Sequence, residues 1–290
     1  MNIFRCTSIP EHHVGNITAE AADWWTWSDA ARWVLLNLGT AGENTMKPRM
    51  VYITSGREEY DYSFTLSPGK VGDACVEATV RALANDLVRA NSEEKLFLLG
   101  NMMIGADITG NAVHCFFALL RGALVEATGT EWTALHAPPG ATGARVREFP
   151  LHSDLYVCPM LMNIFDEVPD DGSGATSFIR SSDFLEVVQE VDSVPHWCRA
   201  RIAECFHGER SEDGFDELYT LVYGKGTGLV RTPNLWTEDL VLAMDSRKEE
   251  ICLRRGEGYL LDDRKWLHGR AAPSGGVPAR RIHRLVYTPR

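Results

Sequence analysis

The sequence of 290 residues lacks the features that mark membrane-spanning or secreted chains. It has no run of about 18 apolar residues, and the longest near-apolar stretches, residues 96–99 and 115–120, are too short to cross a bilayer. The N-terminal segment MNIFRCTSIPEHH has no apolar region of the kind found in a secretory signal. The seven cysteines are scattered and form no CxxC pair, which argues against a disulfide framework or a zinc ribbon. We therefore expect a cytoplasmic protein in a reducing compartment.

An excess of positive charge is also absent. The chain has 29 basic and 40 acidic residues, a formal net charge of −11. This balance argues against a nucleic-acid partner and against adhesion to anionic membrane lipid. The motifs GxGxxG, GxxxxGK[ST], GxSxG and HExxH do not occur. Their absence disfavours a dinucleotide-binding fold, a P-loop, an α/β-hydrolase nucleophile and a zinc protease.

Hydrophobic patterning predicts an α+β protein that is mainly β in its second half. Residues 1–93 are expected to form a helical layer, with helices over residues 28–38 and 73–90. From residue 94, short apolar runs alternate with Gly and Pro and read as strands. These runs are LFLLG, VREFPLHSDLYVCPMLMNIF, SFI, ELYTLVYG, EEICLR, GYLLDD and RRIHRLVYTP.

Two helical stretches, residues 182–191 and 195–206, interrupt these strands. The pattern predicts one domain over residues 1–290. Its mostly antiparallel core covers residues 94–290 and contains a helical insert at about residues 183–245.

The segment FPLHSD has the spacing of a metal-binding pair. Residues i and i+2 of a strand face the same way, so His152 and Asp154 project together. An imidazole and a carboxylate are two of the three ligands of the 2-His-1-carboxylate arrangement that holds Fe(II). His268, at the end of the apolar run in GEGYLLDDRKWLHGR, is the candidate second histidine. A structural role is the alternative for each of these side chains.

A basic strand follows His268. In ARRIHRLVY, Arg280 and Arg284 share one face of the predicted strand with Ile282. If that face lines a barrel, two inward guanidinium groups need an anion, and a dicarboxylate matches the bidentate geometry of Arg. A bulge would place Arg281 inward instead of Arg280. A solvated strand face is the alternative.

HSD, GxGxT at residues 172–176, LLDDRKWLHGR and RxxxR at residues 280–284 occur in an order that resembles the iron(II)/2-oxoglutarate-dependent oxygenases. The pattern is most similar to the clavaminate synthase-like and taurine dioxygenase-like group, and the resemblance covers residues 145–290. It implies a double-stranded β-helix (jelly-roll, cupin-like) core and a helical lid insert. It also implies Fe(II), 2-oxoglutarate as cosubstrate and O2.

Carried over by position, the resemblance makes His152, Asp154 and His268 the iron ligands, with no further catalytic side chain. It makes Arg280 the ligand of the distal carboxylate of 2-oxoglutarate, to which Thr176 donates a hydrogen bond. Arg284 would contact the cosubstrate or an anionic group of the substrate. Cys158 and Met160 would line the substrate pocket, with core packing as the competing role. The glycine-rich segment here, GSGAT, departs from the family pattern.

The implied activity is hydroxylation of an unactivated C–H bond in a small molecule, such as an amino acid or a natural-product intermediate, with 2-oxoglutarate and O2 converted to succinate and CO2. Desaturation, cyclisation or epimerisation would use the same ligand set, whereas the carboxylate of Asp154 disfavours halogenation. Two alternatives remain open: a non-catalytic cupin-type protein that binds a metal or small ligand, and a metal enzyme that uses no 2-oxoglutarate. The sequence leaves the substrate and the oligomeric state open.

Overall fold

The computed structural model describes most of the chain. The described residues are 4–11, 13, 15–27, 45–53, 57–65, 74–91, 95–100, 110–130, 132–137, 148–153, 160–168, 173–207, 214–227, 230–274 and 281–287. For strands β3, β4, β6 and β15, whose residue ranges are given in the next paragraph, the structure describes the backbone.

The larger sheet has nine strands in the order β1-β2-β5-β13-β8-β15-β6-β4-β3. Its strands are β1 (Phe4–Thr7), β2 (Ala22–Trp27), β3 (Thr45–Ile53), β4 (Arg57–Thr65), β5 (Leu96–Gly100), β6 (Trp132–Ala137), β8 (Leu161–Glu167), β13 (Gly258–Leu261) and β15 (Arg281–Tyr287). Neighbouring strands run antiparallel except for β2 and β5, which are parallel.

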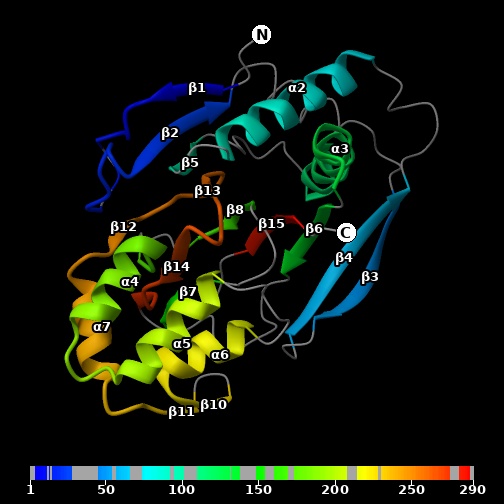
Figure 1. The fold of residues 1–290 in the computed structure, drawn as a ribbon. Coiled ribbons are helices and arrows are strands. Elements are labelled where there is room, and N and C mark those ends of the chain that lie inside the picture. Colours follow the sequence, from blue (N-terminus) through cyan, green and yellow to red (C-terminus); the bar gives the residue numbers. More distant parts are fainter. Residues whose placement is uncertain are drawn as a thin grey trace.

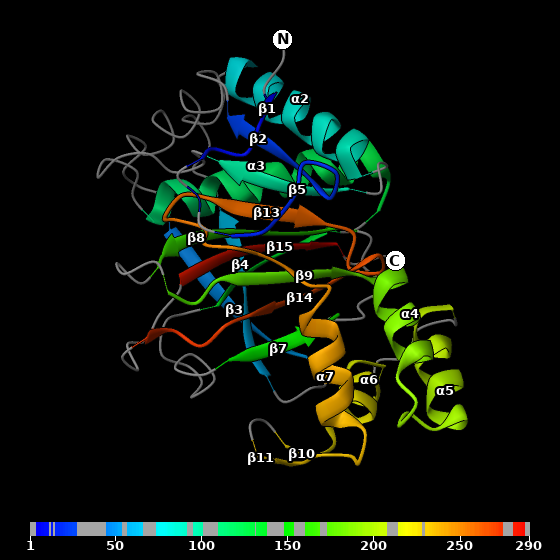
Figure 2. The same cartoon turned by 90° about the vertical axis from the view of Figure 1, so that its left-hand side faces the viewer.

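The smaller sheet has four antiparallel strands in the order β12-β9-β14-β7. They are β7 (Phe149–His152), β9 (Thr176–Arg180), β12 (Glu249–Ile251) and β14 (Trp266–Arg270). An apolar core draws on both sheets. Its largest members are Trp24, Phe165, Phe178, Tyr259 and Trp266. Figure 2 shows β9, β14 and β7 of the smaller sheet side by side.

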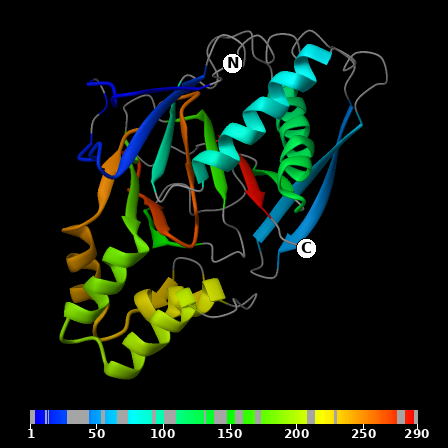
Figure 3. The same cartoon turned by 45° about the horizontal axis from the view of Figure 1, so that its top comes forward.

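Helices lie at opposite ends of the molecule (Figures 1 and 3). The helices α2 (Ala74–Asn91) and α3 (Gly110–Thr128) pack together, and α3 contacts β6 and β4 of the larger sheet. Between β9 and β12 the chain forms a helical insert, in which the hairpin β10 (Lys225–Thr227) and β11 (Val230–Thr232) precedes the last helix. Its helices are α4 (Ser181–Glu190), α5 (His196–His207), α6 (Gly214–Tyr223) and α7 (Thr237–Asp245).

A second apolar core joins this insert to the smaller sheet. Leu151, Ile179 and Leu267 of β7, β9 and β14 pack with buried side chains from the helices, such as Phe184 and Leu240. The strands therefore bury both faces, because alternate residues point into the core between the sheets and into the core under the insert. This double burial fixes their positions.

The α+β prediction with mostly antiparallel sheets is confirmed, as are the helix expected at residues 73–90 and the helical insert. The expectation of a helical layer over residues 1–93 is wrong. The described part of this segment contains β1 to β4 and a single helix, α2, and Trp24, Trp25 and Trp27 lie in β2. Trp24 is buried in the core between the sheets, as is typical of an aromatic residue on the covered face of a strand. The helix expected at residues 28–38 lies outside the described residues.

Two further helices differ from expectation. The run ELYTLVYG, expected to be a strand, is the C-terminal part of α6. Its buried side chains Leu218 and Val222 are four positions apart, as on one face of a helix, and both belong to the apolar core under the insert. The helix α3 was not predicted. None of the helices in the described part of the chain has the length and hydrophobicity needed to span a bilayer.

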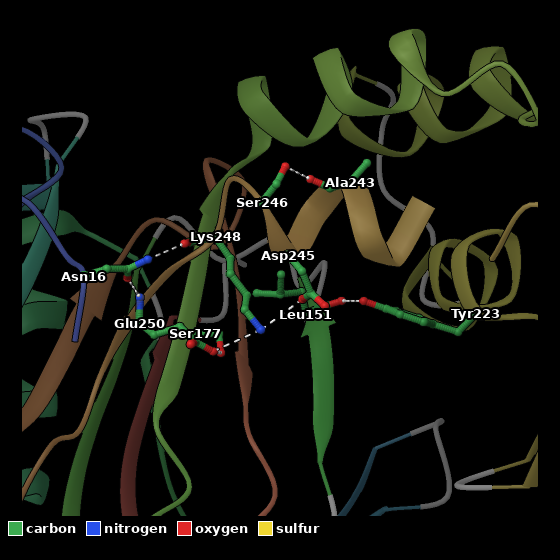
Figure 4. A network of polar contacts seen from close by, with 9 residues as sticks. All are labelled: Asn16, Leu151, Ser177, Tyr223, Ala243, Asp245, Ser246, Lys248 and Glu250. Carbon is green, nitrogen blue, oxygen red and sulfur yellow. Dashed lines mark hydrogen bonds and ion pairs between the residues drawn. The ribbon is translucent and has the colours of Figure 1, made fainter. Parts of the chain in front are cut away.

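A polar network ties the N-terminal segment and the insert to the smaller sheet (Figure 4). Asn16 accepts a hydrogen bond from the backbone N–H of Glu250 and donates one to the carbonyl of Lys248. The Glu250 carboxylate accepts a hydrogen bond from Ser177 and pairs with Lys248, which also pairs with Asp245 of α7.

Within the insert, the Tyr223 hydroxyl of α6 donates a hydrogen bond to the carbonyl of Leu151 at 2.7 Å (Figure 4). Helix α6 is thereby fixed to β7, directly beside His152. Burial, followed by nearby negative charge that includes Glu148 and Asp245, raises the pKa of Tyr223 well above its usual range.

We expect Tyr223→Phe to lower the free energy of unfolding by about 1 kcal/mol at pH 8, because a hydrogen bond is lost. Above pH 10 the unfolded chain ionises this phenol while the folded protein keeps it neutral, so the wild-type advantage should shrink by up to about 1.4 kcal/mol per pH unit. Urea unfolding of both proteins from pH 8 to 11 measures this difference. A difference that stays constant over this range would contradict the assigned burial of the hydroxyl.

Candidate metal centre

Strand pairing brings two of the predicted iron ligands together. His152 at the end of β7 lies directly opposite His268 of β14 in the antiparallel register. Residues directly opposite each other project to the same face of a sheet with their Cβ atoms about 5 Å apart. The two imidazole rings accordingly lie 4.4 Å apart between centroids, at an angle of 50°. Both side chains are buried, at 3% and 4% exposure.

The pairing of β7 with β14 is irregular next to the histidines. Phe149 pairs with Arg270 and His152 with His268, so four residues of β7 lie opposite three of β14. Such a bulge re-aims the side chains around it, and a proline, which has no N–H for the ladder, is tolerated there. Pro150 is the residue at this position, and its carbonyl is turned toward the His152 ring.

This carbonyl determines which ring nitrogen of His152 is open to a metal. His152 Nδ1 lies 2.8 Å from the Pro150 carbonyl oxygen. Because a carbonyl only accepts, Nδ1 carries the hydrogen, and Nε2 of the neutral ring presents its lone pair. A hydrogen bond from one ring nitrogen to a backbone carbonyl is the usual support of a metal-ligating histidine.

Gly269 allows the two strands to approach this closely. A Cβ at position 269 would lie 2.9 Å from both the backbone nitrogen of Leu151 and the carbonyl oxygen of Phe149. Contacts this short with backbone atoms force the strands apart. The glycine that follows His268 is therefore a condition for the contact between the two histidines.

The third predicted ligand, Asp154, lies outside the described residues. Within the described part of the chain, no three His, Cys, Asp or Glu side chains are placed to hold a metal ion together. The imidazoles of His152 and His268 are buried next to each other, and Asp154 follows His152 by two positions in the sequence. These three side chains fit the donor set of a 2-His-1-carboxylate iron site. The donor chemistry therefore agrees with Fe(II).

A buried polar cluster adjoins the histidines, and sequence patterning did not identify it. The Ser153 hydroxyl is shared between the carbonyl of Asp263, at 2.6 Å, and its carboxylate oxygen Oδ2, at 3.0 Å. The other carboxylate oxygen of Asp263, Oδ1, lies 3.7 Å from His268 Nδ1. The only signal in the sequence is the acidic pair that ends the apolar run GYLL.

The predicted cosubstrate residue Thr176 lies near His268 on the neighbouring strand. Phe178 of β9 is directly opposite His268, and Thr176 is two residues before Phe178, so both face the core between the sheets. Thr176 is 2% exposed. Thr176 and His268 therefore share the inner face of the smaller sheet.

Of the predicted cosubstrate arginines, Arg284 is in β15 of the larger sheet. Arg284 of β15 is opposite Asn163 of β8, and Asn163 donates a hydrogen bond to the Tyr259 hydroxyl in the core between the sheets. The register thus places position 284 on the inner face. The ladder is irregular between Arg281 and Ile282, so alternation cannot be extended back to Arg280, which lies outside the described residues.

Of the two predicted pocket residues, Cys158 lies outside the described residues. Met160 is buried just before β8, at 3% exposure. In the alternation of β8 its position corresponds to Met162, whereas Leu161 and Asn163 face inward. Contact of Met160 with a substrate stays a prediction.

No protein-family model and no curated protein matches the sequence. Among solved structures, the chain is similar to an asparagine oxygenase in complex with Fe(II), 2S,3S-3-hydroxyasparagine and succinate, at 11% identity over 91% of this chain and 92% of that chain, with a TM-score of 0.45. It is also similar to the non-heme iron oxygenase OrfP in complex with Fe and alpha-ketoglutaric acid, at 12% identity over 93% and 94% of the two chains, with a TM-score of 0.44.

We expect Gly269→Ala to push β7 away from β14, at a cost of about 1–3 kcal/mol in the free energy of unfolding. It should also weaken metal binding, because His152 and His268 move apart. Gly122→Ala is the matched control, since a Cβ there meets nothing within 4 Å and lies within helix α3. That change should be neutral or stabilising by up to about 1 kcal/mol. Urea unfolding and anaerobic Co(II) titration measure both effects, and equal behaviour of the two variants would contradict the close-approach role.

Proposed function

We propose that this protein is an Fe(II)/2-oxoglutarate-dependent oxygenase that hydroxylates an unactivated C–H bond of a small molecule. The observation that carries the proposal is the buried cross-strand contact of His152 and His268, whose rings are 4.4 Å apart. Together with Asp154 these histidines would hold Fe(II) and leave three coordination positions for cosubstrate and oxygen. When bound, the iron and 2-oxoglutarate would supply the oxidising chemistry with O2 as the oxidant: one oxygen atom would enter the substrate and the other succinate, and CO2 would be released.

We propose that the core is a double-stranded β-helix. In chain order, its strands are β6, β7, β8, β9, β12, β13, β14 and β15. They divide into the orders β13-β8-β15-β6 and β12-β9-β14-β7, so the chain crosses repeatedly between the two sheets. This is the strand exchange of a double-sheet jelly roll. Because β1, β2 and β5 extend the same large sheet, we treat residues 1–290 as one oxygenase domain.

Thr176 and Arg284 support the proposal for the cosubstrate. Their positions lie on the inner faces of opposite sheets, so a dicarboxylate between the sheets would meet both. A hydroxyl donates one hydrogen bond and a guanidinium donates two in parallel, which suits a carboxylate. Arg280 remains the proposed main ligand of the distal carboxylate, with Arg281 as the alternative across the bulge.

The remaining residues of the site would position the substrate and exclude water. Phe178 and Tyr259 pack edge to face beside His268, with ring centroids 5.1 Å apart, and form an apolar wall. We propose that the insert acts as a lid, because Tyr223 fixes α6 to the carbonyl of Leu151, one residue before His152. No general base is required in this scheme. Water exclusion by a lid protects reactive species from side reactions.

The proposed substrate is a small molecule, such as an amino acid or a natural-product intermediate. Desaturation, cyclisation or epimerisation would use the same residues. The net charge of −11 supports the absence of nucleic-acid and membrane partners, and the scattered cysteines support a cytoplasmic location.

The first test is an anaerobic visible spectrum of the metal-free protein titrated with Fe(II), with and without 2-oxoglutarate. We expect a weak charge-transfer band only when both are present. His152→Ala and Asp154→Ala should remove the band and abolish succinate release while the fold is retained. His196→Ala, at an exposed position on α5, is the matched control and should keep both signals.

The possible results separate the candidate functions. Iron binding without the band would favour a metal enzyme that does not use 2-oxoglutarate. The absence of iron binding would favour a cupin-type binding protein, in which the two histidines have a structural role. Full activity of either the His152 or the Asp154 variant would contradict the assignment of these residues as iron ligands.

A further inference from the structure

A carboxylate is buried beside the second metal-binding histidine. Asp263 is 1% exposed, and its Oδ1 lies 3.7 Å from Nδ1 of His268, which is 4% exposed. This distance is longer than a hydrogen bond, but it is within the range of electrostatic contact. Burial of a carboxylate is costly unless nearby groups stabilise it. The location of Asp263 in the turn between β13 and β14 therefore calls for a specific role.

The adjacent carboxylate, Asp262, has a different partner from Asp263. Its carboxylate accepts hydrogen bonds from the guanidinium and the backbone N–H of Arg264, at 3.0 to 3.1 Å. The Arg264 side chain is about half exposed. The two consecutive carboxylates thus have different surroundings, since Asp262 pairs toward the surface and Asp263 faces the imidazole.

Ser153 connects Asp263 to the other metal-binding strand. Ser153 is fully buried and lies between His152 and Asp154 in the sequence. Its hydroxyl contacts both the carbonyl and the Oδ2 atom of Asp263. With Oδ2 held by Ser153, Oδ1 is the carboxylate oxygen that faces His268. The middle residue of the HSD segment thereby links the strand of His152 to the turn that leads into the strand of His268.

We propose that Asp263 is the positioning residue of His268, and that Ser153 holds the carboxylate in place for this role. A metal ion at Nε2 of His268 requires the ring hydrogen to be on Nδ1. Nδ1 then donates toward Asp263 Oδ1, which fixes the ring orientation and makes Nε2 a stronger ligand. This inference rests on the proposed function, because it assumes that His268 binds a metal.

The two histidines then have different supports. His152 donates from Nδ1 to a neutral carbonyl, that of Pro150, whereas His268 faces a carboxylate. A carboxylate partner increases the electron density of the imidazole more than a neutral carbonyl does. Loss of Asp263 should therefore change the electronic properties of the bound metal as well as its affinity.

The test is an anaerobic Co(II) titration of the metal-free full-length protein, followed by its ligand-field absorption. We expect Asp263→Asn to weaken Co(II) binding about ten- to a hundredfold and to shift the absorption bands. Asp262→Asn makes the same change at the adjacent buried carboxylate, which does not face His268. We expect it to change the affinity less than about threefold and to leave the bands in place.

Ser153→Ala tests the arrangement from the other strand, and it does so even if Asp263→Asn fails to fold. It should weaken Co(II) binding by about three- to tenfold, because Asp263 keeps its charge but loses its anchor. Thermal unfolding of each metal-free variant shows whether the fold is retained. A purely structural role would lower the midpoint of unfolding and leave the absorption bands of the bound Co(II) unchanged.

Equal affinity and equal spectra of the Asp263 and Asp262 variants would overturn the inference. So would complete loss of binding in Asp263→Asn to the level of His152→Ala, because Asp263 would then be a metal ligand itself. If the wild-type protein binds no Co(II) or Fe(II), the proposed function fails and this inference fails with it. If the wild type binds and His152→Ala does not, but Asp263→Asn binds like the wild type, the inference alone is wrong.

Discussion

His152 and His268 lie directly opposite each other on neighbouring antiparallel strands, and their contact requires the two backbones to approach closely. Gly269 permits this approach, since a Cβ there would press on the backbone of β7. The bulge that contains Pro150 then turns a carbonyl toward His152 and fixes its hydrogen on Nδ1. Under the proposed function, a metal site on this strand pair would have two of its ligands in place before an ion binds. Such pre-organisation reduces the ordering cost of ligand binding.

The surroundings of this contact explain how polar side chains are retained in the interior. Both faces of the smaller sheet are covered, by the core between the sheets and by the core under the insert. Each buried polar group without a partner would cost about 1–3 kcal/mol. Ser153 and Asp263 contact each other, and Asp263 faces His268, so these polar groups offset part of one another's desolvation. The apolar cores hold the strands in place, and the polar cluster orients the ring nitrogens.

The predictions for ELYTLVYG and for the N-terminal layer are wrong because a short segment does not reveal the tertiary contacts that it makes. Short apolar runs fit both a strand and a buried helix, so ELYTLVYG read as a strand although Leu218 and Val222 lie on one face of α6. The tryptophans of residues 24–27 are in β2 because pairing with β5 buries Trp24 against the second half of the chain. Such non-local pairing leaves no periodic signal in the segment itself. By contrast, α2 has a clear helical stripe and was predicted correctly.

Side-chain periodicity and residue chemistry are local properties, so the sequence alone was enough to predict the α+β class and the helical insert and to select His152 and His268 as candidate ligands. Tertiary structure decided which residues support those histidines. Gly269 lies against β7 residues more than 100 positions away, and Ser153, 110 positions from Asp263, holds the carboxylate that faces His268. The register of β14 against β7 creates those contacts, and register is set by the packing of whole sheets. For the same reason, the inward position of Arg284 follows from its pairing with Asn163 and could only be conjectured from alternation in one strand.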